Sequence, residues 1–130
     1  MTVKVFRGIQ AGPSLQARDT FEGVAWRDPV FDEDGVNAGN NFFAPGGRTS
    51  WHTHEGGQLL IIVAGSGFVV DDTAVNRVEA GDMVWTPPGV RHWHGGCSDR
   101  FLMHTTVSLG STAWHDPVTD EEFSAAETTP

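Results

Sequence analysis

The sequence predicts an all-β protein, and three features of the chain support this prediction. Its apolar runs are short, and the clearest of them, residues 58–63, is rich in β-branched side chains that favour strands. Sixteen glycines and seven prolines lie between the apolar runs, which indicates frequent turns. With 130 residues and 38% hydrophobic content, the chain is long enough to build one core, and we expect residues 1–130 to form a single domain.

The expected strands follow one another along the chain and are separated by turn signals. Residues 32–35, 44–47 and 71–73 are rich in Asp, Gly, Pro and Thr, which is typical of turns. The expected strands are residues 3–6, 23–26, 40–44, 48–54, 58–63, 67–70, 76–78, 82–86, 92–94 and 101–108. Their number and spacing suit a closed antiparallel sandwich or barrel.

A short helix is expected after the last strand. Residues 116–123 contain Thr119 and, three residues later, Glu122, which is the pattern of a helix capping box. The final residues, 125–130, are expected to be frayed.

Neither a membrane segment nor a secretion signal is predicted. No stretch approaches the roughly 20 apolar residues that a membrane span needs. Residues 1–7 are read as an edge strand rather than a signal peptide. Cys97 is the only cysteine, so no intrachain disulfide is possible and the residue is interpreted as a small packing side chain. These features predict a cytoplasmic protein that does not associate with a membrane.

The charge of the chain argues against nucleic acid as a partner. Seventeen acidic and eight basic residues give a formal net charge of −9. Such a chain repels phosphate backbones and anionic lipids at long range. The expected partner is a small-molecule substrate.

Three histidines and a glutamine indicate a mononuclear metal site. Side chains at i and i+2 of a strand share a face, so His52 and His54 point one way while Trp51 and Thr53 point the other. A Glu-Gly-Gly turn then brings Gln58 back beside the pair at the start of the next strand. Pairing of a second hairpin, which carries a Pro-Pro-Gly turn before His92, would bring this residue to the others.

The proposed ligands His52, His54, Gln58 and His92 carry no charge, which determines the chemistry of the site. Because they cancel none of the charge of one divalent ion, the ion would be a strong Lewis acid toward an alkoxide, enolate or hydroxide. Imidazole nitrogen and amide oxygen admit Mn, Fe, Co, Ni or Zn.

Two further histidines are candidates for proton transfer. His94 lies two residues beyond His92 and shares its face, and the alternation of residues 101–108 turns His104 inward. Imidazoles titrate near neutral pH, so both are interpreted as catalytic, although a structural role is the usual one for a buried histidine. His115 is assigned to the surface or a subunit contact. The aromatic residues Phe43, Trp85, Trp93 and Phe101 are expected in the core or in a pocket wall.

At these residues the sequence resembles the cupin family. Its first motif, a glycine, an H-x-H pair, a fourth ligand and a second glycine, is matched by Gly46, His52, His54, Gln58 and Gly65, and its second by Gly81, Pro87, Gly89 and His92. Gln58 replaces the usual glutamate, and Gly96 stands where asparagine is common. The resemblance implies a cupin double-stranded β-barrel, or jelly roll, with a core at about residues 37–108, and a homodimer or dimer-based homo-oligomer.

A narrower resemblance is to small bacterial manganese-dependent cupin hydroxynitrile lyases. It is carried by residues 48–54, 81–85, 92–95, 103–104 and 118–121, together with Gln58. It implies manganese at the four ligands, assistance from His94 and His104, and cleavage or formation of α-hydroxynitriles. A cupin dioxygenase using Fe(II) is the alternative. A metal or small-ligand binding module and an isomerase of sugar acids also stay open. Against the isomerase, no anion-binding arginine cluster is obvious beyond Arg48 and Arg91.

Overall fold

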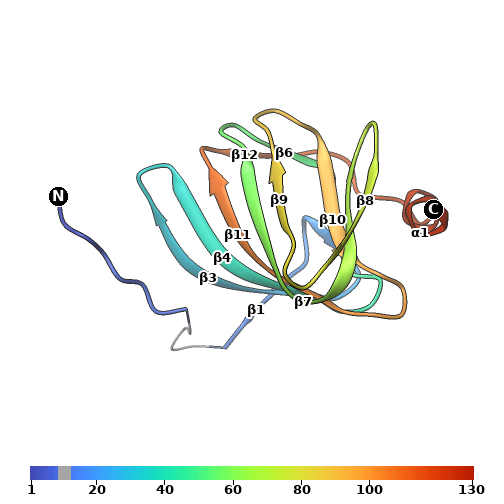
Figure 1. The fold of residues 1–130 in the computed structure, drawn as a ribbon, viewed down its shortest axis with the longest axis horizontal. Coiled ribbons are helices and arrows are strands. Elements are labelled where there is room, and N and C mark those ends of the chain that lie inside the picture. The colour runs from blue at the N-terminus through green and yellow to red at the C-terminus, as the bar shows by residue number, and fades with distance from the viewer. Residues whose placement is uncertain (9–12) are drawn as a thin grey trace.

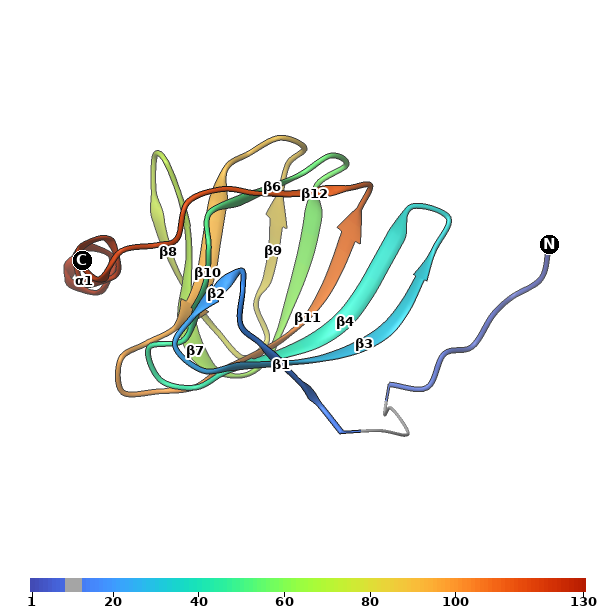
Figure 2. The same cartoon turned by 180° about the vertical axis from the view of Figure 1, so that it is seen from behind.

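The computed structural model describes residues 1–8 and 13–130, and its strands form one curved antiparallel sheet that closes into a nearly complete barrel (Figures 1 and 2). The strands are β1 (Leu15–Ala17), β2 (Phe21–Glu22), β3 (Ala25–Glu33), β4 (Val36–Phe43), β5 (Arg48–Thr49), β6 (His52–His54), β7 (Gln58–Asp71), β8 (Val75–Glu79), β9 (Met83–Thr86), β10 (His92–Gly96), β11 (Leu102–Leu109) and β12 (Thr112–Trp114), and the helix is α1 (Asp120–Thr128). The prediction of an all-β barrel with a C-terminal helix is confirmed.

Strand β7 connects the two halves of the barrel. Its first half pairs with β9 and β11, and its second half pairs with β8 and β10. Gly65 lies between the halves with φ +79°, and a Cβ there would lie 2.0 Å from the carbonyl oxygen of Phe101. The sequence predicts two strands, residues 58–63 and 67–70, but the structure has one strand that bends at its glycines.

Two apolar clusters lie on opposite sides of the sheet. The inner cluster contains Ala25, Phe43, Leu60, Ile62, Val69, Val78 and Leu102. The outer cluster joins the sheet to the C-terminal helix and contains Trp51, Phe68, Val70, Trp93, Val118, Phe123 and Ala126. The alternation of side chains along the strands thus gives the barrel a filled interior and a docking face for the helix.

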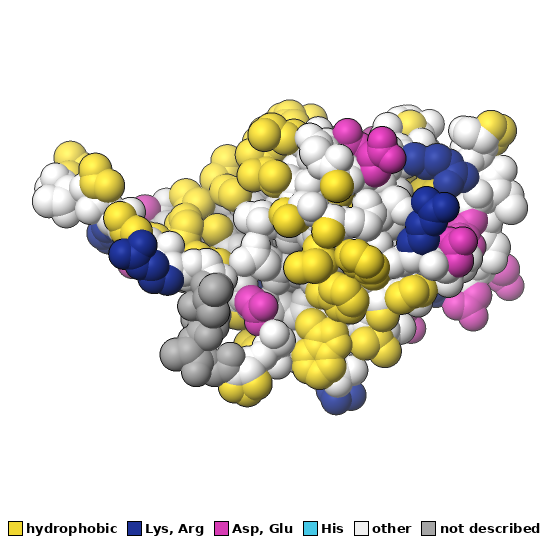
Figure 3. Space-filling view, turned by 60° about the horizontal axis from the view of Figure 1, so that its bottom comes forward, with side chains coloured by type: hydrophobic (Ala, Val, Ile, Leu, Met, Phe, Trp, Pro, Cys, Tyr) yellow, Lys and Arg dark blue, Asp and Glu magenta, His cyan; other side chains and the backbone are white. Residues whose placement is uncertain are grey.

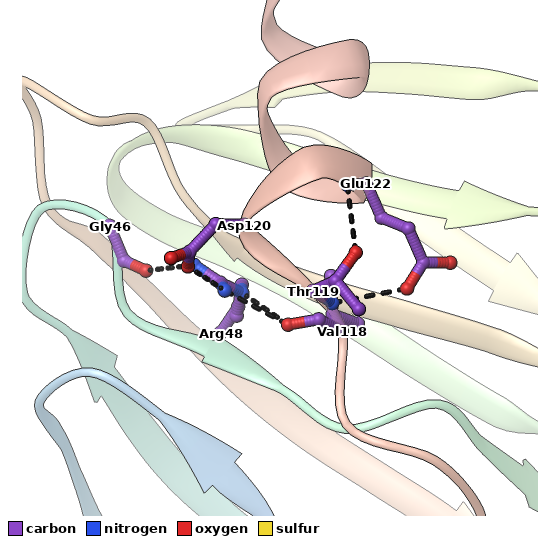
Figure 4. A network of polar contacts seen from close by, with 6 residues as sticks. All are labelled: Gly46, Arg48, Val118, Thr119, Asp120 and Glu122. Carbon is purple, nitrogen blue, oxygen red and sulfur yellow. Dashed lines mark hydrogen bonds and ion pairs between the residues drawn. The ribbon is translucent and has the colours of Figure 1, made fainter.

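The C-terminal helix is capped as its sequence predicts, and Arg48 anchors it to the barrel (Figure 4). Thr119 Oγ1 accepts a hydrogen bond from the Glu122 backbone N–H, and the Glu122 side chain accepts one from the Thr119 N–H. Arg48 reaches across from β5 and donates to the Val118 carbonyl oxygen and to Asp120. The expectation of frayed residues 125–130 is wrong, because α1 continues to Thr128 and Ala126 is buried in the outer cluster.

The N-terminal part of the chain differs from the prediction. Residues 3–6 do not form a strand, although Val3 and Val5 alternate with polar neighbours. Their side chains are exposed, and the segment contacts the barrel through Lys4 with Glu33 and through the stacked rings of Phe6 and Phe31. Alternation alone does not make a strand without a neighbouring strand to pair with.

Strands β3 and β4 form a longer hairpin than expected. They run from Ala25 to Phe43 and turn at Asp34 and Gly35, both of which have positive φ. A register shift between Pro29 and Phe31 breaks the period of two that would have revealed this hairpin in the sequence. Strand β12 was also missed.

Several large hydrophobic side chains lie on the outside of the barrel. Trp85 and Phe101 were expected in the core or a pocket wall, but they are 52% and 40% exposed. Met83 and Trp85 on β9 lie opposite Ile61 and Leu59 on β7, which makes the outer surface apolar at this point. Figure 3 shows one face on which hydrophobic side chains gather. The homo-oligomer stays a prediction. Within the described residues, no helix has the length and apolar character to cross a membrane.

Candidate metal centre

The four predicted ligands converge from three strands. His52 and His54 are the ends of β6, and His52 lies opposite His92 on the neighbouring β10. Gln58 begins β7 directly after the turn that follows β6. All four side chains are at least 97% buried. Trp51 points the other way, into the outer cluster, as the alternation predicted.

The donor atoms are close enough to share one ion. The ring nitrogens that His52, His54 and His92 turn toward one another all lie within 4.8 Å. Nε2 of His92 is 3.2 Å from Oε1 of Gln58. The predicted grouping of these four residues is therefore present in the fold.

A hydrogen bond at Nδ1 orients each histidine. The Nδ1–H of His52 donates to the Ser50 carbonyl oxygen at 2.8 Å, and that of His92 donates to the Val90 carbonyl oxygen at 3.0 Å. Since a carbonyl only accepts, Nδ1 carries the hydrogen in both rings, and Nε2 keeps its lone pair. His54 Nδ1 lies 2.9 Å from the hydroxyl oxygen of Thr112 on β12. Such partners are typical of metal-binding histidines.

Burial keeps these rings neutral. It is the largest cause that lowers the pKa of His52, His54 and His92, and it brings the pKa of His54 to about 4. The Gln58 amide nitrogen donates to Ser108 Oγ at 3.1 Å, which turns the amide oxygen toward the histidines. Lone pairs therefore face one another across a buried space, and His54 Nε2 has no hydrogen-bond partner among the described residues. A cation between these atoms would resolve this repulsion, so the residues fit a metal.

His94 and His104 form a buried pair beside the four ligands. His104 Nε2 and His94 Nδ1 are 3.0 Å apart. Burial is the main cause that lowers the pKa of both, and the pKa of His104 falls to about 4. The ring of His94 lies 5.2 Å from that of His52 and lines the cavity, whereas His104 lies behind His94 against Phe43. The catalytic roles of both residues stay predictions.

His52, His54 and Gln58, together with His94, line a cavity of about 410 Å³. Its wall also includes Phe21, Arg27, Asp32, Asn37, Asn41, Thr49, Thr106, Ser108, Gly110, Ser111, Thr112 and Trp114. Trp114 packs against His52 with its ring tilted by 38°, and the ring centroids are 4.7 Å apart. Sequence reasoning missed the aromatic wall of Phe21 and Trp114 and the polar wall from the β3–β4 hairpin. Phe43 and Trp93, which were expected in the core or a pocket wall, are buried in the two apolar clusters.

The chain is similar to known proteins in sequence and in fold. Residues 42–108 match a family model described as a cupin domain. The chain is 39% identical over 113 residues to an (R)-mandelonitrile lyase from Granulicella tundricola, covering 81% of this chain and 86% of that protein. The solved structure of a cupin-like protein from Thermotoga maritima is 32% identical, with a TM-score of 0.85 over 94% of this chain and 98% of its own. A predicted oxalate decarboxylase from the same organism has a TM-score of 0.72 at 18% identity, over 83% of this chain and 100% of its own, and shares the fold.

Proposed function

The chain belongs to the cupin family, and we propose that it is a metal-dependent lyase that cleaves or forms α-hydroxynitriles. The observation that carries this proposal is the buried, uncharged donor set of His52, His54, Gln58 and His92, three of which line a cavity. The relative from Granulicella tundricola, named an (R)-mandelonitrile lyase, supports the same reaction class.

The donor set suits a reaction that develops negative charge on oxygen. One divalent cation held by the four residues, which we propose to be manganese, would act as a Lewis acid that lowers the pKa of a substrate hydroxyl. Gln58 contributes by binding through a neutral oxygen, since a carboxylate at this position would offset part of that charge. Ser108 contributes by fixing the orientation of the amide.

The reaction requires one proton to move twice. The hydroxyl of the cyanohydrin loses its proton, the bond to the nitrile carbon breaks, and the electron pair leaves with cyanide. Cyanide then takes up a proton, and the products are a carbonyl compound and hydrogen cyanide. His94 is the residue that we propose for both transfers, because its buried Nε2 lacks a partner among the described residues and its ring lines the cavity.

His104 would act through His94 as a positioning residue. When His94 Nδ1–H donates to His104 Nε2, the His94 Nε2 lone pair is free to accept the hydroxyl proton. When the shared hydrogen lies on His104, His94 Nε2–H can donate to cyanide. The low pKa values of the pair favour return of the proton to the leaving group.

Two aromatic side chains would hold the organic part of the substrate. Phe21 and Trp114 line the cavity, and their ring centroids are 6.0 Å apart. Trp114 is 42% exposed, so it lies where the cavity meets solvent. An aromatic or aliphatic group could pack there while the hydroxyl points to the histidines.

A direct experiment tests the proposal. Protein purified without chelators or metal-affinity columns is analysed for its metals, then incubated anaerobically with mandelonitrile while benzaldehyde and cyanide are measured above a buffer blank. We expect cleavage that disappears on treatment with a chelator and returns with manganese. Folded, metal-loaded protein that releases no cyanide would overturn the proposal. Oxygen consumption with an aromatic or diketone substrate would instead support an Fe(II) dioxygenase.

A further inference from the structure

A basic side chain lies in the wall of the metal-centre cavity, on the hairpin of β3 and β4. Arg27 pairs in register with Asn41, and Asn41 pairs with His104 on β11. Both Arg27 and Asn41 line the cavity, and Asn41 is buried with an amide oxygen that has no partner among the described residues. The inner surface of this hairpin is thus polar and incompletely hydrogen-bonded.

The guanidinium group of Arg27 lies beside Gly39 and is held by a side-chain hydrogen bond. A Cβ at Gly39 would be in ordinary van der Waals contact with Nη2 of Arg27, at 3.5 Å. Nη2 donates to the neutral Oδ1 of Asn37 at 2.7 Å, and this is the hydrogen bond that Arg27 makes within residues 1–8 and 13–130. A guanidinium has five N–H donors, so the group is held in place while most of its donors stay available.

The charge of Arg27 is not neutralised by a contacting carboxylate. Burial lowers the pKa of the guanidinium, and the negative charge of Asp32 opposes this change. Asp32 also lines the cavity, but its side chain is exposed, and in the described part of the chain it forms no ion pair with Arg27. Arginine keeps its proton at every physiological pH. The cavity therefore has a positive group at its wall as well as a neutral donor set for a cation.

The two arginines that the sequence singled out have other contacts. Arg48 is bound to the Val118 carbonyl oxygen and to Asp120, where it anchors the C-terminal helix (Figure 4). Arg91 stacks on Trp51, with its Cζ 3.9 Å from the ring centroid. Arg27 is the arginine that lines the cavity.

We propose that Arg27 binds a carboxylate group of the substrate, at the end of the molecule remote from the carbon that reacts beside His94. This inference rests on the proposed function, because it assumes that the reacting end lies at the histidines. A planar guanidinium matches a carboxylate with two parallel hydrogen bonds. The cavity of about 410 Å³ has room for a small molecule that carries both groups. The substrate class is a small α-hydroxynitrile that carries a carboxylate group at its other end.

Pairs of ligands of equal size test whether the protein recognises a second carboxylate. Succinate and glutarate each carry two carboxylates, whereas succinamate and glutaramate keep one carboxylate and replace the other with a neutral amide of the same size. Binding to metal-loaded protein is measured by calorimetry. We expect at least one dicarboxylate to bind about tenfold or more tightly than its monoamide, which is the gain expected from a charge-assisted pair.

Four variants assign this preference to Arg27. Arg27→Gln should remove the preference for the dicarboxylate. Arg27→Lys should keep part of this preference, because lysine retains the positive charge but lacks the planar pair of N–H donors. Asp32→Asn should increase it, since a negative charge at the wall is removed. Arg18→Gln is the control for net charge, because Arg18 is exposed and does not line the cavity. Melting temperature and metal content are measured on each preparation.

The binding measurements can contradict the role proposed for Arg27 in two ways. Equal binding of the dicarboxylates and their monoamides, or a preference that survives Arg27→Gln, would overturn the inference. If Arg27→Gln does not fold, Arg27→Lys and Asp32→Asn carry the test, and unchanged preference in both would overturn it. If the protein cleaves cyanohydrins but does not bind dicarboxylates more tightly than their monoamides, only the role of Arg27 is excluded. If it binds dicarboxylates more tightly but cleaves no cyanohydrin, the proposed reaction is excluded and the carboxylate site stands.

Discussion

Nε2 of His92 and Oε1 of Gln58 lie 3.2 Å apart, and both atoms present lone pairs to the same space. The Nδ1–H of His92 is committed to the Val90 carbonyl oxygen, and the Gln58 amide nitrogen is committed to Ser108. A neutral His92 therefore has no hydrogen to give to Gln58. A buried contact between two acceptors is unfavourable unless a cation lies between them.

Removal of one donor should empty the site. His52→Ala and His92→Ala each remove one of the four donors. Loss of only a hydrogen-bond partner of a metal ligand typically weakens metal affinity by about 10-fold to 100-fold. We expect the loss of a donor itself to weaken it more. Elemental analysis after dialysis measures the effect. His115→Ala is the control, since His115 is exposed and does not belong to the donor cluster. Near-stoichiometric metal in either variant, with an unchanged melting temperature, would exclude the site.

Replacement of Gln58 with glutamate should separate metal binding from turnover. Gln58→Glu is expected to keep or tighten metal binding, because a carboxylate attracts the ion. It should slow cyanohydrin cleavage by roughly tenfold, equivalent to one unit in the pKa of the bound hydroxyl. The comparison requires the same metal occupancy in both proteins, measured on the samples used for kinetics. Equal or faster cleavage by the variant would contradict the role given to the neutral amide.

The grouping of the four candidate metal donors could be predicted because their spacing is mostly local. His52 and His54 share a strand face, and a three-residue turn returns the chain to Gln58, so short-range geometry brings three of the four together. His92 needed the long-range pairing of β10 with β6, which the resemblance to cupins supplied and the register confirms.

The wall opposite the donors could not be predicted from the same rules. Arg27 and Asn41 face the cavity because β3 and β4 form a long hairpin, and a shift at Pro29 disrupts the alternation that would have placed them. Trp114 belongs to a strand of three exposed residues with no apolar pattern. Its position follows from pairing with β6, which brings it opposite His52. Such residues depend on tertiary pairing rather than on local pattern.

The free energy of unfolding of the metal-free protein should decrease as the pH is lowered from 6.5 to about 4. The ordinary pKa of histidine is 6.5, and burial lowers that of folded His104 to about 4. Below pH 6.5 the unfolded chain takes up a proton that folded His104 resists, so this stability is present above 6.5 and is lost as the pH falls to about 4. The slope for one histidine is about 1.4 kcal/mol per pH unit. Denaturant titrations from pH 7 to pH 4 should show a shallower slope for His104→Gln than for the wild type, and equal slopes would contradict the prediction.

The remaining prediction concerns the link between His104 and His94. We expect His104→Leu to retain metal, because the four ligands are unchanged, and to lower cyanohydrin turnover by roughly 100-fold if His104 sets the hydrogen on His94 for proton transfer. His104→Gln should recover part of the activity, since an amide oxygen can accept the hydrogen of His94 Nδ1. The pH profile of kcat/KM should also shift in His104→Leu.

A double substitution distinguishes this positioning role from a purely structural one. If His104 acts only through His94, the variant that combines His94→Ala and His104→Leu should be no slower than His94→Ala alone, because the second substitution removes a partner that has nothing left to orient. A structural role instead predicts a lower melting temperature, additive losses and no recovery with glutamine. Metal content, melting temperature and turnover measured on the same preparations separate these results. Wild-type turnover and a wild-type pH profile in metal-loaded His104→Leu would remove His104 from the mechanism.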